Sequence, residues 1–191
     1  AINPIVMVST AVAFPGQPQM VAARFLASLL TAVIVGFFWN GFAHPDWLTS
    51  KMKVHEHGNR LDDFVSTAAS DFLQAGGFLV AGAGLVAAMQ TVVPPSAFDH
   101  LGGSGPLSIL VMAGLAITLS VCSEADAFVA AGMTQFSLTS RLVFLTVGPM
   151  VDLKLIALQA GAFGKGFSMR FTPLVLTVAI VTASVVGSVL L

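Results

Sequence analysis

The sequence predicts an all-α, polytopic transmembrane protein with broken or re-entrant helices and a weak internal repeat. Hydrophobic residues make up 56% of the 191 residues and charged residues only 9%, whereas about a quarter of a soluble domain is charged. Several apolar runs approach the roughly 20 residues that cross a bilayer as a helix. Prolines, glycines and ionisable residues interrupt these runs, which predicts helices that break at membrane depth.

Four or five apolar segments approach the length of a membrane span. Residues 2–14 form a short helix, with Asn3 as its N-cap and Pro4 as its first helical residue. Residues 20–39 form a full span that is interrupted only by Arg24 near its beginning. Further spans are expected at 71–93, which is rich in the small residues that allow close helix packing, and at 141–160 and 171–191, whereas 107–121 is apolar but short.

Basic residues predict the orientation of the segments. Lysine and arginine concentrate in 40–60 and again in 165–170, so both loops are expected on the cytoplasmic side. Residues 107–140 must then enter the membrane from outside and return, as a re-entrant hairpin with its tip near Cys122. His55 and His57 lie in the first basic loop, where a solvated role is expected rather than a metal site.

The beginning of the chain predicts a fragment. It has no initiator methionine and no basic region typical of a signal peptide. It reads instead as an internal helix that is cut at its start.

A weak repeat relates residues 2–16 to residues 151–165. Asn3 aligns with Asp152, and each segment leads through a glycine-containing turn to an Arg-Phe pair and a further span. Both helices are expected to start at a proline, Pro4 and Pro149. Repeats that contain discontinuous helices are typical of secondary transporters.

The stretch "LSVCSEADAFVAAG", residues 119–132, carries the first group of candidate site residues. If a helix restarts here, Ser123 is a natural N-cap and Asp126 takes the capping-box position. Glu124 and Asp126 would lie in the first turn, where the helix dipole favours carboxylates. The acids can simply cap a broken helix, or they can line a pathway. A charge at membrane depth costs about 2.5–3.5 kcal/mol and generally marks a functional site, so a pathway is favoured.

A second group follows in "GPMVDLKL". Asp152 and Lys154 are two residues apart and so point to nearly opposite sides of a helix. Each needs a partner from elsewhere, and the available charges are Arg141, Glu124 and Asp126. Either an ion pair locks two helices together, or Asp152 faces the cavity of the other acids with Asn3 opposite.

Cys122 is the only cysteine, which excludes an internal disulfide. Its thiolate is a possible soft ligand for a metal or metalloid. A cage of three thiolates would need ligands from outside this chain. No nucleotide-binding pattern and no nucleophile with its base are visible, so neither a cofactor nor an enzyme is predicted, and no basic patch suggests nucleic acid.

The stretches "SVCSEADAFVAA", "VGPMVDLKLIALQAGAF" and "AINPIVMVSTAVAFPG" together resemble a bacterial predicted-permease family. That family includes the ArsP-type organoarsenical exporters, in which cysteines bind trivalent arsenicals. The resemblance implies a permease of two halves. Residues 1–39 would end the first half, 40–69 would form a cytoplasmic loop and an amphipathic lead, and 70–191 would form the second half.

The predicted function is a secondary transporter or efflux permease for a small solute, with trivalent arsenicals as one candidate. It would be a multi-pass protein of a bacterial plasma membrane, and its partners would be the lipid bilayer, the solute and the missing N-terminal half. The alternative is a membrane subunit that binds partners without transporting. The candidate pathway residues are Cys122, Ser123, Glu124, Asp126, Asp152, Lys154, Asn3 and Pro4.

Overall fold

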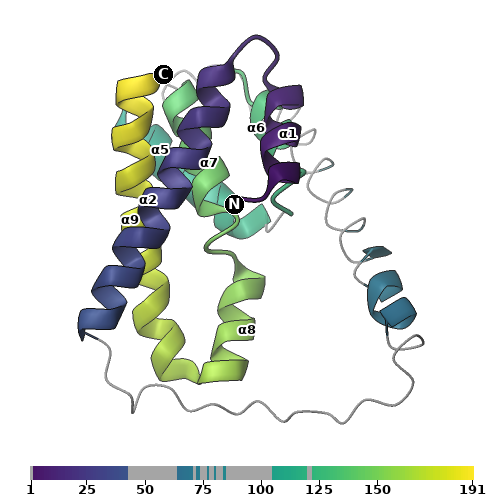
Figure 1. Ribbon diagram of the computed structural model, residues 1–191, viewed down its shortest axis with the longest axis vertical. Helices are drawn as coiled ribbons and strands as arrows, with labels where there is room; N and C mark the ends of the chain where they lie inside the picture. The colour runs from purple at the N-terminus through teal and green to yellow at the C-terminus, as the bar shows by residue number, and fades with distance from the viewer. Residues whose placement is uncertain are drawn as a thin grey trace.

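The computed structural model describes residues 2–42, 64–70, 72–73, 77, 80, 84, 105–119 and 122–191, and every regular element in them is an α-helix. Residues 43–60 of the predicted loop, with His55 and His57, lie outside the described residues, as does most of the predicted span at 71–93. The helices are α1 Pro4–Ala13, α2 Pro18–Phe42, α5 Pro106–Leu119, α6 Asp126–Gly132, α7 Leu138–Val147, α8 Leu153–Phe163 and α9 Lys165–Leu190 (Figure 1).

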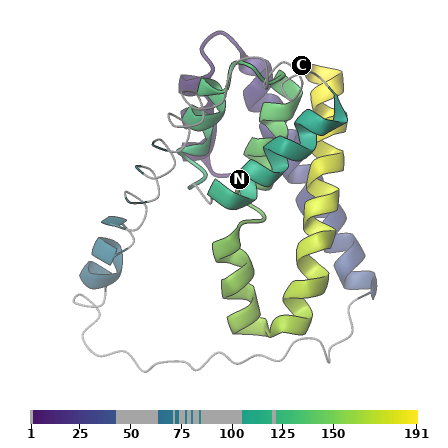
Figure 2. The same cartoon turned by 180° about the vertical axis from the view of Figure 1, so that it is seen from behind.

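Two helical hairpins of matched dimensions frame the molecule. In each, a short helix of 10 or 11 residues, α1 or α8, leads into a long helix of 25 or 26 residues, α2 or α9. The turns contain Gly16 at φ 78° and Gly164 at φ 92°, a conformation that glycine adopts without steric cost. Helices α2 and α9 pack side by side in opposite directions (Figures 1 and 2). The second hairpin is therefore inverted relative to the first.

Both short helices begin near the middle of the long pair and run to opposite ends of it (Figure 1). The side chain of Asn3 accepts a hydrogen bond from the backbone N–H of Ile5 at 3.1 Å, and a proline follows it, so the predicted start of α1 is confirmed. The Asp152 carboxylate likewise accepts from the N–H of Leu155. Both N-caps thus occupy corresponding positions of the two hairpins.

The predicted start of the second short helix at Pro149 is wrong. Helix α7 ends at Val147, and the carbonyl of Val147 then accepts hydrogen bonds from the N–H groups of Met150 and Val151. Pro149 lies inside this turn, and α8 starts only where the Asp152 side chain can cap it. The predicted span at 141–160 is accordingly split into α7 and α8.

The predicted loop at 165–170 is also wrong, because these residues are helical. Helix α8 continues to Phe163 and α9 begins at Lys165. Gly164 alone reverses the chain between them, since its positive φ makes a sharp turn possible. Helices α2 and α9 are the two described helices that are long and apolar enough to cross a membrane.

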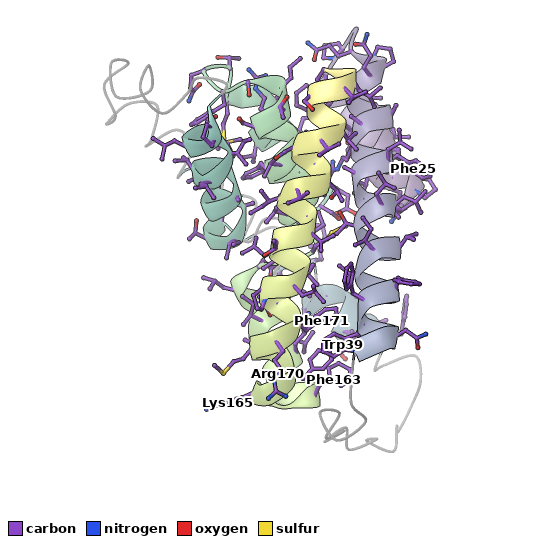
Figure 3. The ribbon with its side chains drawn as sticks, turned by 90° about the vertical axis from the view of Figure 1, so that its left-hand side faces the viewer. Phe25, Trp39, Phe163, Lys165, Arg170 and Phe171 are labelled. Atoms are coloured by element: carbon purple, nitrogen blue, oxygen red, sulfur yellow. The ribbon has the colours of Figure 1, made fainter. Side chains whose placement is uncertain are left out.

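An aromatic cluster closes one end of the α2–α9 pair. The ring of Trp39 packs edge-on against Phe167 and Phe171, with centroids 5.0 Å apart in both cases. Figure 3 shows Trp39, Phe163 and Phe171 at the end of α9 that carries Lys165 and Arg170. This is the arrangement that tryptophan and basic residues adopt at a membrane surface.

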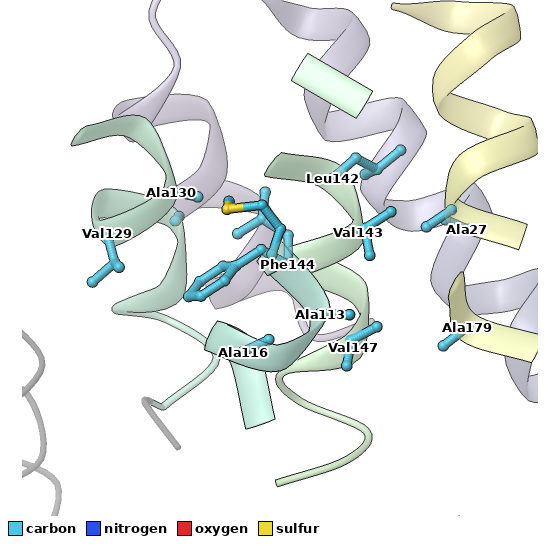
Figure 4. Close-up of a cluster of buried hydrophobic side chains, with 14 of the residues drawn as sticks. Ala27, Ala113, Ala116, Val129, Ala130, Leu142, Val143, Phe144, Val147 and Ala179 are labelled. Carbon is cyan, nitrogen blue, oxygen red and sulfur yellow. The ribbon is translucent and has the colours of Figure 1, made fainter. Parts of the chain in front are cut away.

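The short helix α7 forms the centre of the core, and all its residues from 142 to 147 are buried. Small side chains from α2, α5 and α9 lie against it, including Ala27, Ala113 and Ala179 (Figure 4). Hydroxyl pairs link the helices. Ser108 of α5 bonds Ser140 of α7 at 2.7 Å, and a similar pair at 2.6 Å joins α2 to α9. The helices thus approach closely through small residues and satisfied hydroxyls, as is typical of membrane packing.

Candidate functional site

The side chain of Arg24 on α2 is completely buried, with 0% of its surface exposed. Its Nη1 donates to the hydroxyl of Thr10 on α1 at 2.8 Å, and its Nη2 donates to the carbonyl of Ser123 at 2.9 Å. The Thr10 hydroxyl gives its own proton to the carbonyl of Val6, so it acts as an acceptor toward Arg24. One guanidinium thereby joins α1, α2 and the turn before α6.

Main-chain hydrogen bonds shape this turn. The carbonyl of Cys122 accepts from the N–H groups of both Ala125 and Asp126, each at 3.0 Å. Helix α6 starts at Asp126, and no side chain caps it. The prediction of Ser123 as the N-cap is therefore wrong, because the Cys122 carbonyl already closes the first turn. Ser123 contributes its backbone carbonyl to Arg24 instead.

Asp126 is the second buried ionisable residue of the site, with only 1% of its surface exposed. A Cβ atom added to Gly148, just after α7, would lie 3.0 Å from Oδ2 of Asp126. The missing side chain at Gly148 therefore makes room for the carboxylate. Arg24, Glu124 and Asp152 are close enough to interact with this carboxylate electrostatically. The end of α7 and the start of α6 thus meet at Asp126.

Two buried polar atoms of this cluster have no hydrogen-bond partner within the described part of the chain. They are Nε of Arg24 and Oδ2 of Asp126. Buried polar atoms are satisfied in most proteins, so an unpaired atom calls for an explanation such as a function or a bound ligand. We refer to Arg24, Asp126, the Ser123 carbonyl and the Thr10 hydroxyl as the buried charged cluster.

The structure brings some of the predicted site residues together and leaves others apart. Asp152 is 8% exposed and near Asp126, whereas Lys154 is exposed on α8, as expected for residues two apart. Glu124 is half-buried beside the cluster. Asn3 and Pro4, by contrast, are exposed at the start of α1.

Cys122 is half-buried and packs against the apolar core. Among the described residues, no three His, Cys, Asp or Glu side chains are grouped so that they could hold a metal ion. Any cage of thiolates around Cys122 would draw its other ligands from outside this chain, because Cys122 is its only cysteine. Arg141 is one of the charges that the sequence offered as a partner for Asp152. Its Nε donates to the carbonyl of Phe136 at 3.0 Å.

Sequence reasoning missed Arg24, Thr10 and Gly148 as members of the site. A signal was present for Arg24, which is the only ionisable residue between positions 20 and 39. A charge inside an apolar span indicates a functional site with a nearby partner. No comparable signal existed for Thr10 or Gly148, because their roles depend on contacts between distant parts of the chain.

A bundle of apolar helices that break around buried charges is characteristic of integral membrane proteins. Comparison with known proteins identifies the group. The model of the predicted permease family ArsP_1 matches residues 1–188, and the chain belongs to this family. The family is described as one of predicted permeases, which are membrane proteins.

Two relatives are similar over most of this chain. The UPF0718 protein YcgR of Bacillus subtilis is 38% identical over 177 residues, which cover 87% of this chain and 59% of the relative. A Streptococcus mutans protein named "Putative two-component membrane permease complex subunit" is 28% identical over 195 residues, 97% of this chain and 65% of the relative. The chain thus spans less than two thirds of the length of either relative. No solved structure matches the chain.

Proposed function

We propose that this chain forms part of a secondary permease that moves a small solute past the buried charged cluster. The observation that carries the proposal is the placement of Arg24 and Asp126. Both are buried where α1, α2, α6 and α7 meet, and each keeps one polar atom without a partner in the described residues. Ionisable residues at membrane depth mark ion or substrate pathways and proton relays.

The inverted hairpins supply a way to expose such a cluster to either side in turn. Inverted repeats with broken helices rock against each other around a fixed site in many secondary transporters. A proton or a cationic solute at Asp126 would weaken its attraction to Arg24. The turn at 122–125, which Arg24 holds through Ser123, would then be free to move relative to α1 and α2.

The proposed placement is a multi-pass protein in a bacterial plasma membrane, with 40–60 and 165–170 on the cytoplasmic side and 107–140 as a re-entrant hairpin. The chain would comprise the end of a first half (1–39), a connecting segment (40–69) and a second half (70–191). The pathway would include Cys122, Glu124 and Asp152 beside the cluster, and Ser123, Lys154, Asn3 and Pro4 at its edges. Efflux of trivalent arsenicals would use Cys122 as a soft ligand.

A second candidate function is that of a non-transporting subunit, which one observation favours. Ile5, Val8 and Val12 form a stripe on α1, and each is 63% exposed. Such a stripe suits a partner protein in the membrane as well as lipid. The relative that is named as a subunit of a two-component complex also makes a separate partner protein a candidate.

Transport by the full-length protein tests the proposal. Everted membrane vesicles under a pH gradient would be assayed with a panel of small solutes that includes trivalent arsenicals. The variants are Asp126→Asn and Arg24→Gln, with Thr118→Val as the control, because the Thr118 hydroxyl is exposed and bonds only within α5.

The proposal predicts that both cluster variants lose at least about tenfold in transport rate at equal expression, the scale expected when a buried charge pair loses one member. Cys122→Ser would separately lose arsenical transport. Unchanged rates in Asp126→Asn and Arg24→Gln would refute the pathway and favour the subunit.

A further inference from the structure

A cavity lies away from the buried charged cluster, between the later part of α2 and the earlier part of α9. Its volume is about 490 Å³, within the roughly 300–1,000 Å³ of small-molecule sites. Val35, Gly36 and Trp39 line it from α2, Phe171 lines it from α9, and Met150 from the turn before α8. We refer to it as the α2–α9 groove.

The groove offers little to a polar ligand. Its lining is mostly aliphatic and aromatic, and its other polar side chains are those of Asn40, which is exposed, and Thr31. The hydroxyl of Thr31, which reaches it, is already bonded to the Ala27 carbonyl and to the Thr182 hydroxyl. A polar solute would have to give up its bonds to water here with little in return. A hydrocarbon chain has no such bonds to lose.

The end of the groove nearest the start of α9 is aromatic and basic. Trp39 and Phe171 close it, and Lys165 and Arg170 are exposed at the same end of α9 (Figure 3). Residues 153–191 and 18–42 contain no aspartate or glutamate at all. The charged side chains that α9 places at this end are therefore both basic.

We propose that the α2–α9 groove binds one acyl chain of an anionic phospholipid, whose headgroup lies against Lys165 and Arg170. Both helices have the length and hydropathy to cross the bilayer, so the groove lies at the depth of the lipid chains. Aromatic rings concentrate at the level of lipid headgroups, and basic residues there attract anionic lipids. The site is separate from the proposed solute pathway and does not depend on it.

Trp39 provides a reporter inside the groove. The full-length protein, with every other tryptophan replaced by phenylalanine, would be reconstituted with increasing fractions of phosphatidylglycerol that carries brominated chains. Bromine quenches tryptophan fluorescence on contact. The same titration with brominated phosphatidylcholine measures contact with ordinary surrounding lipid.

Two glycines of α2 make a matched pair of variants. A Cβ atom at Gly36 or at Gly41 would meet nothing within 4 Å, so both positions have room for the first atom of a side chain. Gly36 lines the groove and Gly41 does not. Gly36→Leu should therefore fill the groove, whereas Gly41→Leu makes the same chemical change outside it. A third variant, Lys165→Gln with Arg170→Gln, removes the basic residues and leaves the groove open.

The proposal predicts half-maximal quenching at a fraction of the anionic lipid about 5- to 25-fold lower than that of the neutral lipid, as expected for one or two basic residues near a headgroup. Gly36→Leu and the double glutamine variant should both abolish this preference, and Gly41→Leu should keep it. Equal quenching by the two lipids in the unmodified groove would overturn the proposal. So would a preference that survives in Gly36→Leu.

Discussion

Thr10→Val removes one hydrogen-bond acceptor from Arg24 while nearly preserving the shape of the side chain. Thr10 is 0% exposed, and its hydroxyl is the partner of Arg24 Nη1 at 2.8 Å. Valine leaves that N–H group buried without a partner. Hydrogen bonds between neutral side chains in membrane proteins average only about 0.6 kcal/mol, but a bond to a charged group contributes about 1.5–3 kcal/mol. The larger value applies here, because the guanidinium cannot turn toward water.

The expected result is a fall in melting temperature of roughly 3–12 °C, since 1 kcal/mol corresponds to about 2–4 °C in a protein of this size. Melting would be followed in detergent by the loss of the monodisperse peak in size-exclusion chromatography. Thr177→Val is the matched control, because the Thr177 hydroxyl is exposed and bonds only to the Pro173 carbonyl of its own helix. Equal melting temperatures for the two variants would refute the role assigned to Thr10.

A double-mutant cycle isolates the bond itself. Arg24→Met removes the donor, so adding Thr10→Val to it should cost clearly less than Thr10→Val alone. An additive result would mean that the two side chains do not interact, because additivity is the behaviour of independent sites.

Substitutions at Gly187 and at Asp152, each with a control, test the packing and the capping of the fold by the same melting assay. A Cβ atom at Gly187 would lie 2.6 Å from Cγ2 and 3.1 Å from Cα of Thr139, so Gly187→Ala should destabilise by about 1–3 kcal/mol. Gly161→Ala on α8, where a Cβ meets nothing, should be neutral or gain up to about 1 kcal/mol; the reverse order would contradict the packing of α7 on α9. Asp152→Ala should cost about 0.5–2 kcal/mol through loss of the N-cap of α8, and Asp152→Ser should recover most of it. If serine is no better than alanine, the carboxylate does not act as a cap.

Hydropathy and local chemistry predict much of the helical framework. The apolar runs at 20–39 and 171–191 correspond to α2 and α9, and the Asn-Pro pair marks the start of α1. These features depend on residues within one or two turns of each other, so the sequence carries them directly. The break between α7 and α8 is predicted for the same reason, from the Gly-Pro pair at 148–149.

The buried charged cluster depends on contacts that no local pattern contains. Arg24 and Ser123 are 99 positions apart, and nothing in their spacing relates them. Asp126 could be singled out because a carboxylate is costly in an apolar segment. Its neighbour Gly148 could not, since a glycine before a proline predicts only a turn. For Ser123 the local pattern predicted a role that the residue does not have. Its side chain suits an N-cap, but the Cys122 carbonyl already accepts the N–H groups at the start of α6.

Cys122 reports directly on whether the turn at 122–125 lines a water-accessible solute pathway. In membrane vesicles that contain the full-length protein, alkylation of the Cys122 peptide by a membrane-impermeant thiol reagent would be measured by mass spectrometry, with and without transported solute. We expect alkylation that the solute slows by at least about tenfold, as expected when a bound ligand covers the thiol for most of the time. Cys122 that reacts only with lipid-soluble reagents, at a rate the solute does not change, would contradict the pathway.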